Sequence, residues 1–171
     1  MIIDLSSILD KTKDHLHLKG VIDLDSLDLG GRNIEIVGPI KYEGKIYRLN
    51  SQIAIDVDIL YSYKENCHRC LKPTTNKVKT VLSGRLVKGK EEDEEDQGLD
   101  ELFYYQNDAL DIDEYIYNQV VFSLPMKSLC SPNCKGLCSV CGVDLNYIKC
   151  DCDRENIDPR LEKLRNFFPK S

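Results

Sequence analysis

The sequence has no apolar run that approaches the roughly 20 residues of a membrane-spanning helix. Its first residues, MIIDLSSILDKTKD, lack both the basic start and the long apolar stretch of a secretory signal. We therefore expect a soluble cytoplasmic protein with no membrane partner. Thiols stay reduced in that compartment, which argues against a disulfide framework for the 8 cysteines.

Catalytic motifs are also missing. A catalytic zinc keeps an open position, usually beside histidine or carboxylate ligands, and the sequence has neither HExxH nor the H-x-E of zinc deaminases. We therefore expect no enzymatic activity and no small-molecule substrate. The pair in Cys67-His-Arg-Cys70 leaves a thiol-redox role open, because cationic neighbours lower the pKa of a thiol. No thioredoxin-like βαβ pattern surrounds that pair, which disfavours this alternative.

The cysteines that are present stand in short-spaced pairs. Cys138-Ser-Val-Cys141-Gly142 is typical of a zinc knuckle, in which a glycine can adopt positive φ. Cys150-Asp-Cys152 follows after a gap of 8 residues, so these four thiolates predict one compact zinc site. Four thiolates also suit an iron–sulfur cluster, although the knuckle favours zinc.

The other four cysteines predict a second site, formed by Cys67, Cys70, Cys130 and Cys134. The segment between its two pairs has 59 residues, and closing it costs only about 1.8 kcal/mol more than closing the short loop. Structural zinc contributes roughly 10–16 kcal/mol in small peptides, so two structural zinc ions are expected. An exchanged pairing, in which Cys67 and Cys70 meet Cys138 and Cys141, stays open.

Periodicity indicates several strands and one main helix. IAIDVDILYSY alternates with period two, as a half-buried antiparallel strand does. We expect a hairpin before it with its turn at Glu43-Gly44, and another strand at Lys77–Gly89 with a bend at Gly84. The helix is expected at Asp111–Leu124, with Asp111 as N-cap and Glu114 completing a capping box. A short helix is expected at Pro159–Phe168.

Together these elements predict an α+β fold, with an antiparallel, barrel-like β-sheet, one main helix and a zinc-bound, cysteine-rich C-terminal tail. The β-rich domain should cover residues 1–125, including an acidic loop at 91–101 and the helix at 111–124. The tail should cover residues 126–171, including the short terminal helix, and should be clipped by metal to residues 67–70.

Charge is unevenly distributed along the chain, although the net charge is only −6. Residues 64–90 carry 8 basic and 1 acidic side chains, whereas residues 91–101 carry 8 acidic and no basic ones. A row of cations suits phosphate contacts, and Tyr61 and Tyr63 are candidates for stacking on bases. The candidate RNA-binding residues are Arg69, Lys72, Lys77, Lys79, Arg85 and Lys88.

Two simpler interpretations of these charges stay open. Lysines commonly face solvent, and each all-thiolate zinc site carries a formal charge of −2 that nearby cations would offset. No motif of the RRM or KH type is present. The acidic run is most simply a solvated loop, but it would also be able to fold back over the basic stretch and compete with an anionic ligand.

Four segments of the chain resemble the bacterial YceD family, the large ribosomal RNA subunit accumulation proteins. In chain order they are CHRCLKP, DIDEYIYNQVVFSLPMKSLCSPNCKGLCSVCGVDLN, CDC and DPRLEKLRNF. The resemblance is most specific from Asp111 to Phe167. Some members of that family lack the tail cysteines but keep the CxRC pair, which favours two independent sites. Asn118 stands where the family commonly has glutamate.

What the resemblance implies is a role in ribosome biogenesis. The expected partner is large-subunit ribosomal RNA or a pre-ribosomal particle, whose RNA the protein would help to accumulate or to process. The alternative is an adaptor that binds a ribosome-assembly protein without touching RNA.

Overall fold

The computed structural model describes residues 1–89 and 101–152. The acidic run Glu91–Asp96 and the helix expected at Pro159–Phe168 lie outside these residues, so both stay predictions. Within the described ranges, no helix has the length and apolar character that crossing a membrane requires.

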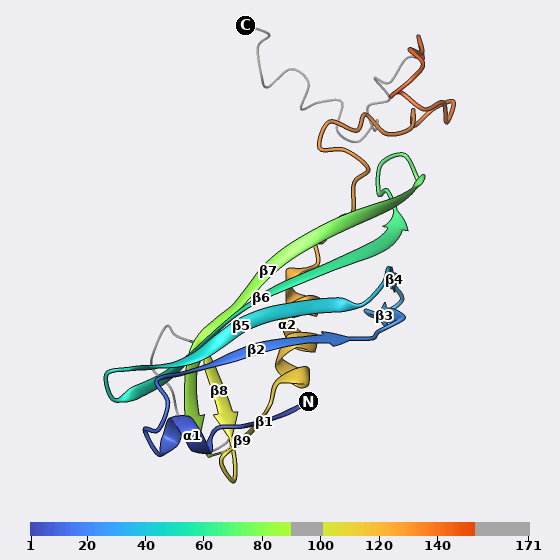
Figure 1. Ribbon diagram of the computed structural model, residues 1–171. Helices are drawn as coiled ribbons and strands as arrows, with labels where there is room; N and C mark the ends of the chain where they lie inside the picture. The colour runs from blue at the N-terminus through green and yellow to red at the C-terminus, as the bar shows by residue number, and fades with distance from the viewer. Residues whose placement is uncertain (90–100, 153–171) are drawn as a thin grey trace, which may run out of the picture.

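A sheet of 7 strands forms the body of the molecule (Figure 1). Its centre is a long hairpin of β6 (Gln52–Asn66) and β7 (Pro73–Lys88). On one side of β6 lie first β5 (Ile40–Leu49) and then, near the hairpin tip, β4 (Asn33–Ile36). The outer strands are β2 (His15–Ile22) beside β5, β3 (Ser26–Asp28) beside β4 and β8 (Leu102–Tyr105) beside β7.

The sheet is antiparallel except for one pair, β7 with β8, which is parallel. The expected antiparallel sheet is therefore confirmed except at this edge. A parallel neighbour needs a crossover connection of about a dozen residues, and the chain has that length between Lys88 and Leu102. The two remaining short strands, β1 (Ile2–Asp4) and β9 (Ala109–Asp111), pair separately, and the short helix α1 (Ser6–Leu9) follows β1.

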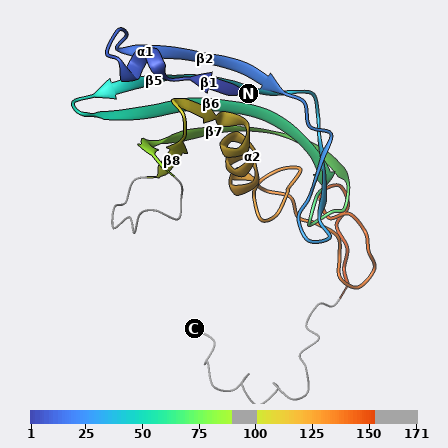
Figure 2. The ribbon, with the colours of Figure 1, turned by 90° about the horizontal axis from the view of Figure 1, so that it is seen from below.

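The helix α2 (Ile112–Ser123) lies under the curved sheet, which curls over it as a half-barrel (Figure 2). Ile112, Ile116 and Val120 of the helix are buried against the inner face of the sheet. The helix begins and ends within one residue of its predicted bounds, and Asp111 is the N-cap. Its side chain accepts from the backbone N–H of Asp113 at 3.3 Å.

Strand β6 confirms the predicted alternation but changes the role of two tyrosines. Ile53, Ile55, Val57 and Ile59 are buried on the inner face, and Tyr61 and Tyr63 continue the same series. Both rings are buried, so the expectation that they stack on bases was wrong. The odd-numbered residues from Ile53 to Tyr63 share the buried face of the sheet, and the alternation therefore carries the tyrosines into the core.

The turn predicted at Glu43-Gly44 was also wrong, because β5 runs straight through Gly44. Gly44 pairs with Leu18 on one side and Val57 on the other. A Cβ at this position would lie 2.1 Å from the backbone oxygen of Asp56. The glycine therefore allows two strands to approach closely, a role that looks like a turn signal in the sequence. The turn between β5 and β6 is at Asn50, whose φ is 57°.

Candidate metal centres

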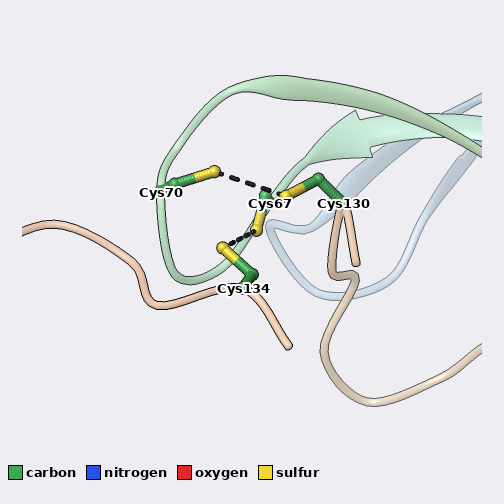
Figure 3. A group of neighbouring side chains, drawn as sticks. All are labelled: Cys67, Cys70, Cys130 and Cys134. Carbon is green, nitrogen blue, oxygen red and sulfur yellow. Dashed lines mark hydrogen bonds between the residues drawn. The ribbon is translucent and has the colours of Figure 1, made fainter. Parts of the chain in front are cut away.

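The first quartet joins the tip of the β6–β7 hairpin to the segment after α2. Its thiols lie in facing pairs, with 3.8 Å between the sulfurs of Cys67 and Cys134 and 3.6 Å between those of Cys70 and Cys130 (Figure 3). All four sulfurs lie within 4.8 Å of one another. Zinc–sulfur bonds of about 2.3 Å in a tetrahedron place sulfurs about 3.8 Å apart, so this quartet fits such an ion.

These distances also bear on the alternatives to a metal. A disulfide needs sulfurs about 2.05 Å apart, and all eight cysteines are free thiols. Each thiol of the CxxC pair lies beside a thiol of the other pair, which is the arrangement of a ligand cluster. Three of the four side chains, Cys67, Cys70 and Cys134, are buried.

The second quartet lies within the tail and consists of Cys138, Cys141, Cys150 and Cys152, whose sulfurs also lie within 4.8 Å of one another. It is more open than the first, since only Cys138 is buried. The structure thus brings together the same two groups of four that the spacing favoured, and not the exchanged pairing.

The two CxxC turns have the same backbone hydrogen bonds. Cys67 N–H donates to Lys72 O and Leu71 N–H to Cys67 O, both at 2.8 Å. In the tail, Cys138 N–H donates to Val143 O and Gly142 N–H to Cys138 O, both at 2.9 Å. The residue after the second cysteine has positive φ in both, 60° at Leu71 and 73° at Gly142. The same turn therefore occurs twice in the chain, once with glycine after the second cysteine and once with leucine.

This turn directs backbone N–H groups at sulfur. Burial raises the pKa of Cys67, but hydrogen bonds from the backbone of Cys70, Cys130 and Arg69 outweigh it and bring that pKa down to about 6. The backbone of Cys141 and Val140 lowers the pKa of Cys138 to about 6.

The pKa values of two other thiols in the quartets are raised instead. Hydrogen bonding to Cys134 and Cys70 raises the pKa of Cys130 to about 12, and hydrogen bonding to Cys141 raises that of Cys152 to about 12. Each quartet therefore stabilises some thiolates while the remaining thiols share protons with them. A divalent cation would replace those protons, because a coordinating thiol is deprotonated by the metal.

The two quartets are connected through Asn146 and Asp144, for which the sequence predicted no role, and through Lys72, which it predicted to bind RNA. In the sequence, Asn146 stands between Cys141 and Cys150 of the second quartet. Its Nδ2 nevertheless donates to the sulfur of Cys134, in the first quartet, at 3.4 Å. Its Oδ1 accepts from the backbone of Lys135 at 2.8 Å. Lys72 forms an ion pair with Asp144 at 2.8 Å, so a residue next to the first quartet holds the loop of the second.

A buried polar network fastens the tail beside the first quartet. Ser128 is fully buried, and its hydroxyl donates to the carboxylate of Glu65 and is hydrogen-bonded to the hydroxyl of Tyr63 at 3.0 Å. Arg32 donates two hydrogen bonds to that carboxylate, each of 2.7 Å. The backbone N–H of Ser128 donates to Nδ1 of His68 at 3.1 Å. Sequence reasoning missed this network, because its members are far apart in the chain and form no motif.

The predicted RNA-binding residues fall in different places. Lys77 and Lys79 are exposed on the outer face of β7, as the strand pattern predicted, whereas Arg85 is half-buried further along that strand. Lys88 lies 3.7 Å from Asp108 near the end of β7. Arg69 donates to the backbone oxygen of Cys134 at 2.7 Å, and Lys72 pairs with Asp144. Lys77, Lys79 and Arg85 thus alternate on one face of β7, whereas Arg69 and Lys72 lie at the hairpin tip beside the quartets.

Comparisons with known proteins place these features in one family. The family described as large ribosomal RNA subunit accumulation protein YceD matches residues 55–168. An uncharacterized protein of Mycobacterium bovis is 33% identical over 98 residues, which is 57% of this chain and 47% of that protein. The large ribosomal RNA subunit accumulation protein YCED homolog 1, chloroplastic, of Arabidopsis thaliana is 25% identical over 156 residues, 75% of this chain and 48% of that protein.

The corresponding protein of Zea mays is 23% identical over 175 residues, 83% of this chain and 59% of that protein. The chain thus spans about half the length of the curated relatives it matches. No solved structure gives a significant match. The family match covers most of the chain and includes the β6–β7 hairpin almost entirely, α2 and all eight cysteines, so this chain belongs to the family of large ribosomal RNA subunit accumulation protein YceD.

Proposed function

We propose that this protein is a non-enzymatic ribosome-biogenesis factor, stabilised by two structural zinc ions, that supports the accumulation or processing of large-subunit ribosomal RNA. The family description and the names of the chloroplastic relatives support the process. The proposed place of action is the compartment in which the large subunit assembles, which for a bacterial cell is the cytoplasm.

The observation that carries the proposal is that the eight cysteines of the matched segment lie in two groups of four. Each quartet supplies four sulfurs, enough to fill the four positions of a tetrahedral zinc ion. A site closed in this way stabilises a fold and leaves no position for a reacting water. The proposed work of the metals is therefore to hold the tail on the hairpin, so that the protein presents one rigid surface to the RNA or to the pre-ribosomal particle.

The test is genetic complementation with a metal readout. In a strain that lacks the gene, the ratio of large- to small-subunit ribosomal RNA should fall and the wild-type gene should restore it. Cys70→Ser should fail to restore the ratio, whereas Ser139→Ala, an exposed change inside the second knuckle, should restore it. The purified protein should carry about two zinc ions per chain. A normal ribosomal RNA ratio in the deletion strain would contradict the proposal.

A second candidate function is an adaptor that binds a ribosome-assembly protein. The observation in its favour is that two large apolar side chains near the end of α2 are exposed, Phe122 by 81% and Met126 by 92%. Exposed large apolar side chains of this kind commonly mark protein interaction sites. Capture of an assembly protein that survives nuclease treatment and is lost in Phe122→Ser would favour this candidate over direct RNA binding.

A further inference from the structure

The outer face of the sheet, which is turned away from α2, has the composition of a binding surface. This outer face consists of the alternate side chains of four strands, namely His15, His17, Lys19 and Val21 of β2, Lys41, Glu43, Lys45 and Tyr47 of β5, Ala54, Asp56, Asp58 and Leu60 of β6, and Lys77, Lys79, Val81 and Ser83 of β7. We propose that unpaired RNA binds across this outer face, with phosphates on its lysines and bases or riboses on its exposed apolar side chains. The inference rests on the proposed function, whose RNA-binding surface it identifies.

The shape of the outer face is the first observation. An open trough of about 1090 Å³ runs across all four strands, from His17 and Lys19 on β2 to Lys79 and Val81 on β7. Figure 2 shows that α2 lies on the opposite side of the sheet, and no described element covers the outer face. A sheet face that is left open in this way, across four strands, has room for a chain-like ligand to lie across it.

The strand register brings together cations that are far apart in the sequence. Lys41 of β5 lies opposite Leu60 of β6, and Leu60 lies opposite Lys79 of β7. Neighbouring strands are about 4.8 Å apart, so these three side chains form one row across the sheet. Lys77 stands two residues from Lys79 on the same face. Sequence reasoning assigned Lys77 and Lys79 to an RNA surface but missed Lys41, because β5 is remote from the basic stretch.

The carboxylates of the outer face are already engaged. Glu43 pairs with Lys19 at 3.1 Å, and Asp58 pairs with Lys79 at 3.1 Å. Asp56 accepts hydrogen bonds from the hydroxyls of Tyr47 and Ser83.

Among the described residues, by contrast, Lys41 and Lys77 have neither an ion pair nor a side-chain hydrogen bond. The end of the outer face that they occupy is therefore positive, and it suits a polyanion. A protein partner would have to present a matching acidic surface, whereas RNA carries a phosphate at every nucleotide.

Exposed apolar side chains lie among these lysines. Leu60 is 49% exposed between Lys41 and Lys79, and Val21 and Val81 are exposed on the neighbouring strands. Such residues contribute nothing to phosphate binding, but they can contact the faces of bases that are not stacked in a duplex. The combination of phosphate and apolar contacts is what distinguishes unpaired RNA from a small anion.

The experiment measures binding of a large-subunit ribosomal RNA transcript to the full-length protein at several salt concentrations. Lys41→Ala/Lys77→Ala should weaken binding roughly fivefold to tenfold at low salt and flatten the logarithmic salt dependence by about 1.4–1.8, since each lost phosphate contact removes about 0.7–0.9. The matched control, Lys11→Ala/Lys127→Ala, removes the same charge from exposed positions outside the outer face. It should change the slope much less.

A second variant separates apolar contact from charge. Leu60→Ser should weaken binding without changing the salt slope, and Val140→Ser, at an exposed apolar position in the tail, should leave binding unchanged. Zinc content and the thermal unfolding midpoint show whether each variant is folded. Equal affinities and slopes for the two double-lysine variants would overturn the inference, as would wild-type protein that restores ribosomal RNA accumulation but does not bind the transcript. Failure of the proposed function has a separate sign, namely a wild-type gene that does not restore the ribosomal RNA ratio.

Discussion

At the scale of single residues, Ser128 shows how the tail is held. Its buried hydroxyl connects Tyr63 and Glu65 of β6 to the segment that follows α2. Ser128→Ala should lower the free energy of unfolding by about 1–3 kcal/mol, because it leaves buried polar groups without a partner. Urea unfolding measures the change, with the exposed Ser139→Ala as control. Equal midpoints for the two variants would show that the network is not structural.

The ion pair of Arg32 with Glu65 predicts a dependence of stability on pH. The hydrogen bonds from Arg32 hold the pKa of Glu65 below its ordinary value of 4.5. A depressed folded-state pKa stabilises the fold above the ordinary pKa, and this contribution is lost as the pH falls through the folded-state pKa. Wild type should therefore exceed Glu65→Gln in stability by about 2 kcal/mol at pH 7.

That difference should shrink as the pH falls below 4.5, because the Glu65 carboxylate is protonated first in the unfolded state and then, at its lower pKa, in the folded state. Denaturant unfolding of both proteins at a series of pH values measures it. Glu35→Gln, which removes an exposed ion pair with Lys64, should show a smaller difference at every pH. A difference between wild type and Glu65→Gln that grows on acidification would contradict the assignment.

Substitution of Asn146, which lies in the loop of the second quartet, should change the metal affinity of the first quartet. Asn146→Ala removes the hydrogen bond to Cys134 and the cap on the Lys135 backbone. Mutating a residue that hydrogen-bonds a metal ligand commonly lowers metal affinity by about 10–100-fold. The first quartet should therefore bind zinc more weakly, although Asn146 lies in the loop of the second quartet. Competition with a chelator measures this, with the exposed Asn133→Ala as control. Loss confined to the second quartet would contradict the prediction.

At the scale of elements, the two knuckles allow a direct comparison of one turn with two sequences. Leu71 holds a φ of 60° that costs an ordinary side chain about 1–2 kcal/mol. Gly142 has the same conformation without that cost, and no atom lies within 4 Å of a Cβ added there. Gly142→Ala should therefore destabilise the second knuckle by strain alone.

Leu71→Gly should relieve the corresponding strain in the first knuckle and leave the zinc affinity and the unfolding midpoint unchanged or higher. Leu71→Val, with a β-branched side chain at positive φ, should lower both. If Leu71→Gly were the more destabilising of the two, the exposed leucine side chain would be making a contact that outweighs its backbone strain.

At the scale of the whole molecule, the first quartet connects segments that are distant in the chain, whereas the second closes within the tail. Cys70→Ser should therefore lower the unfolding midpoint of the entire protein, and Cys141→Ser should loosen the tail while the sheet stays folded. Elemental zinc analysis and amide hydrogen exchange of the sheet distinguish the two results. Equal loss of zinc and equal exposure of the sheet in both variants would show that the contacts through Asn146 and Lys72 couple the sites fully.

The sequence by itself determined the features that depend on neighbours along the chain. The alternation of β6, the bounds of α2 with its Asp111 cap, and the two CxxC turns follow from local spacing, because strand period, helix capping and turn geometry act over a few residues. The membership of the two quartets was favoured by the compact spacing of the four tail cysteines and by the family resemblance, and the structure has the same groups.

Only the tertiary structure decided which side of each element faces the core. The position of α2 made the odd-numbered face of β6 the inner one, and it buried Tyr61 and Tyr63 while exposing Leu60. Close approach of β5 to β6 gave Gly44 its role, and the parallel pairing of β8 with β7 was visible only in the structure. The network around Ser128 and the row of Lys41, Leu60 and Lys79 depend on strand register. They could not be predicted because register joins residues whose separation in the sequence carries no signal.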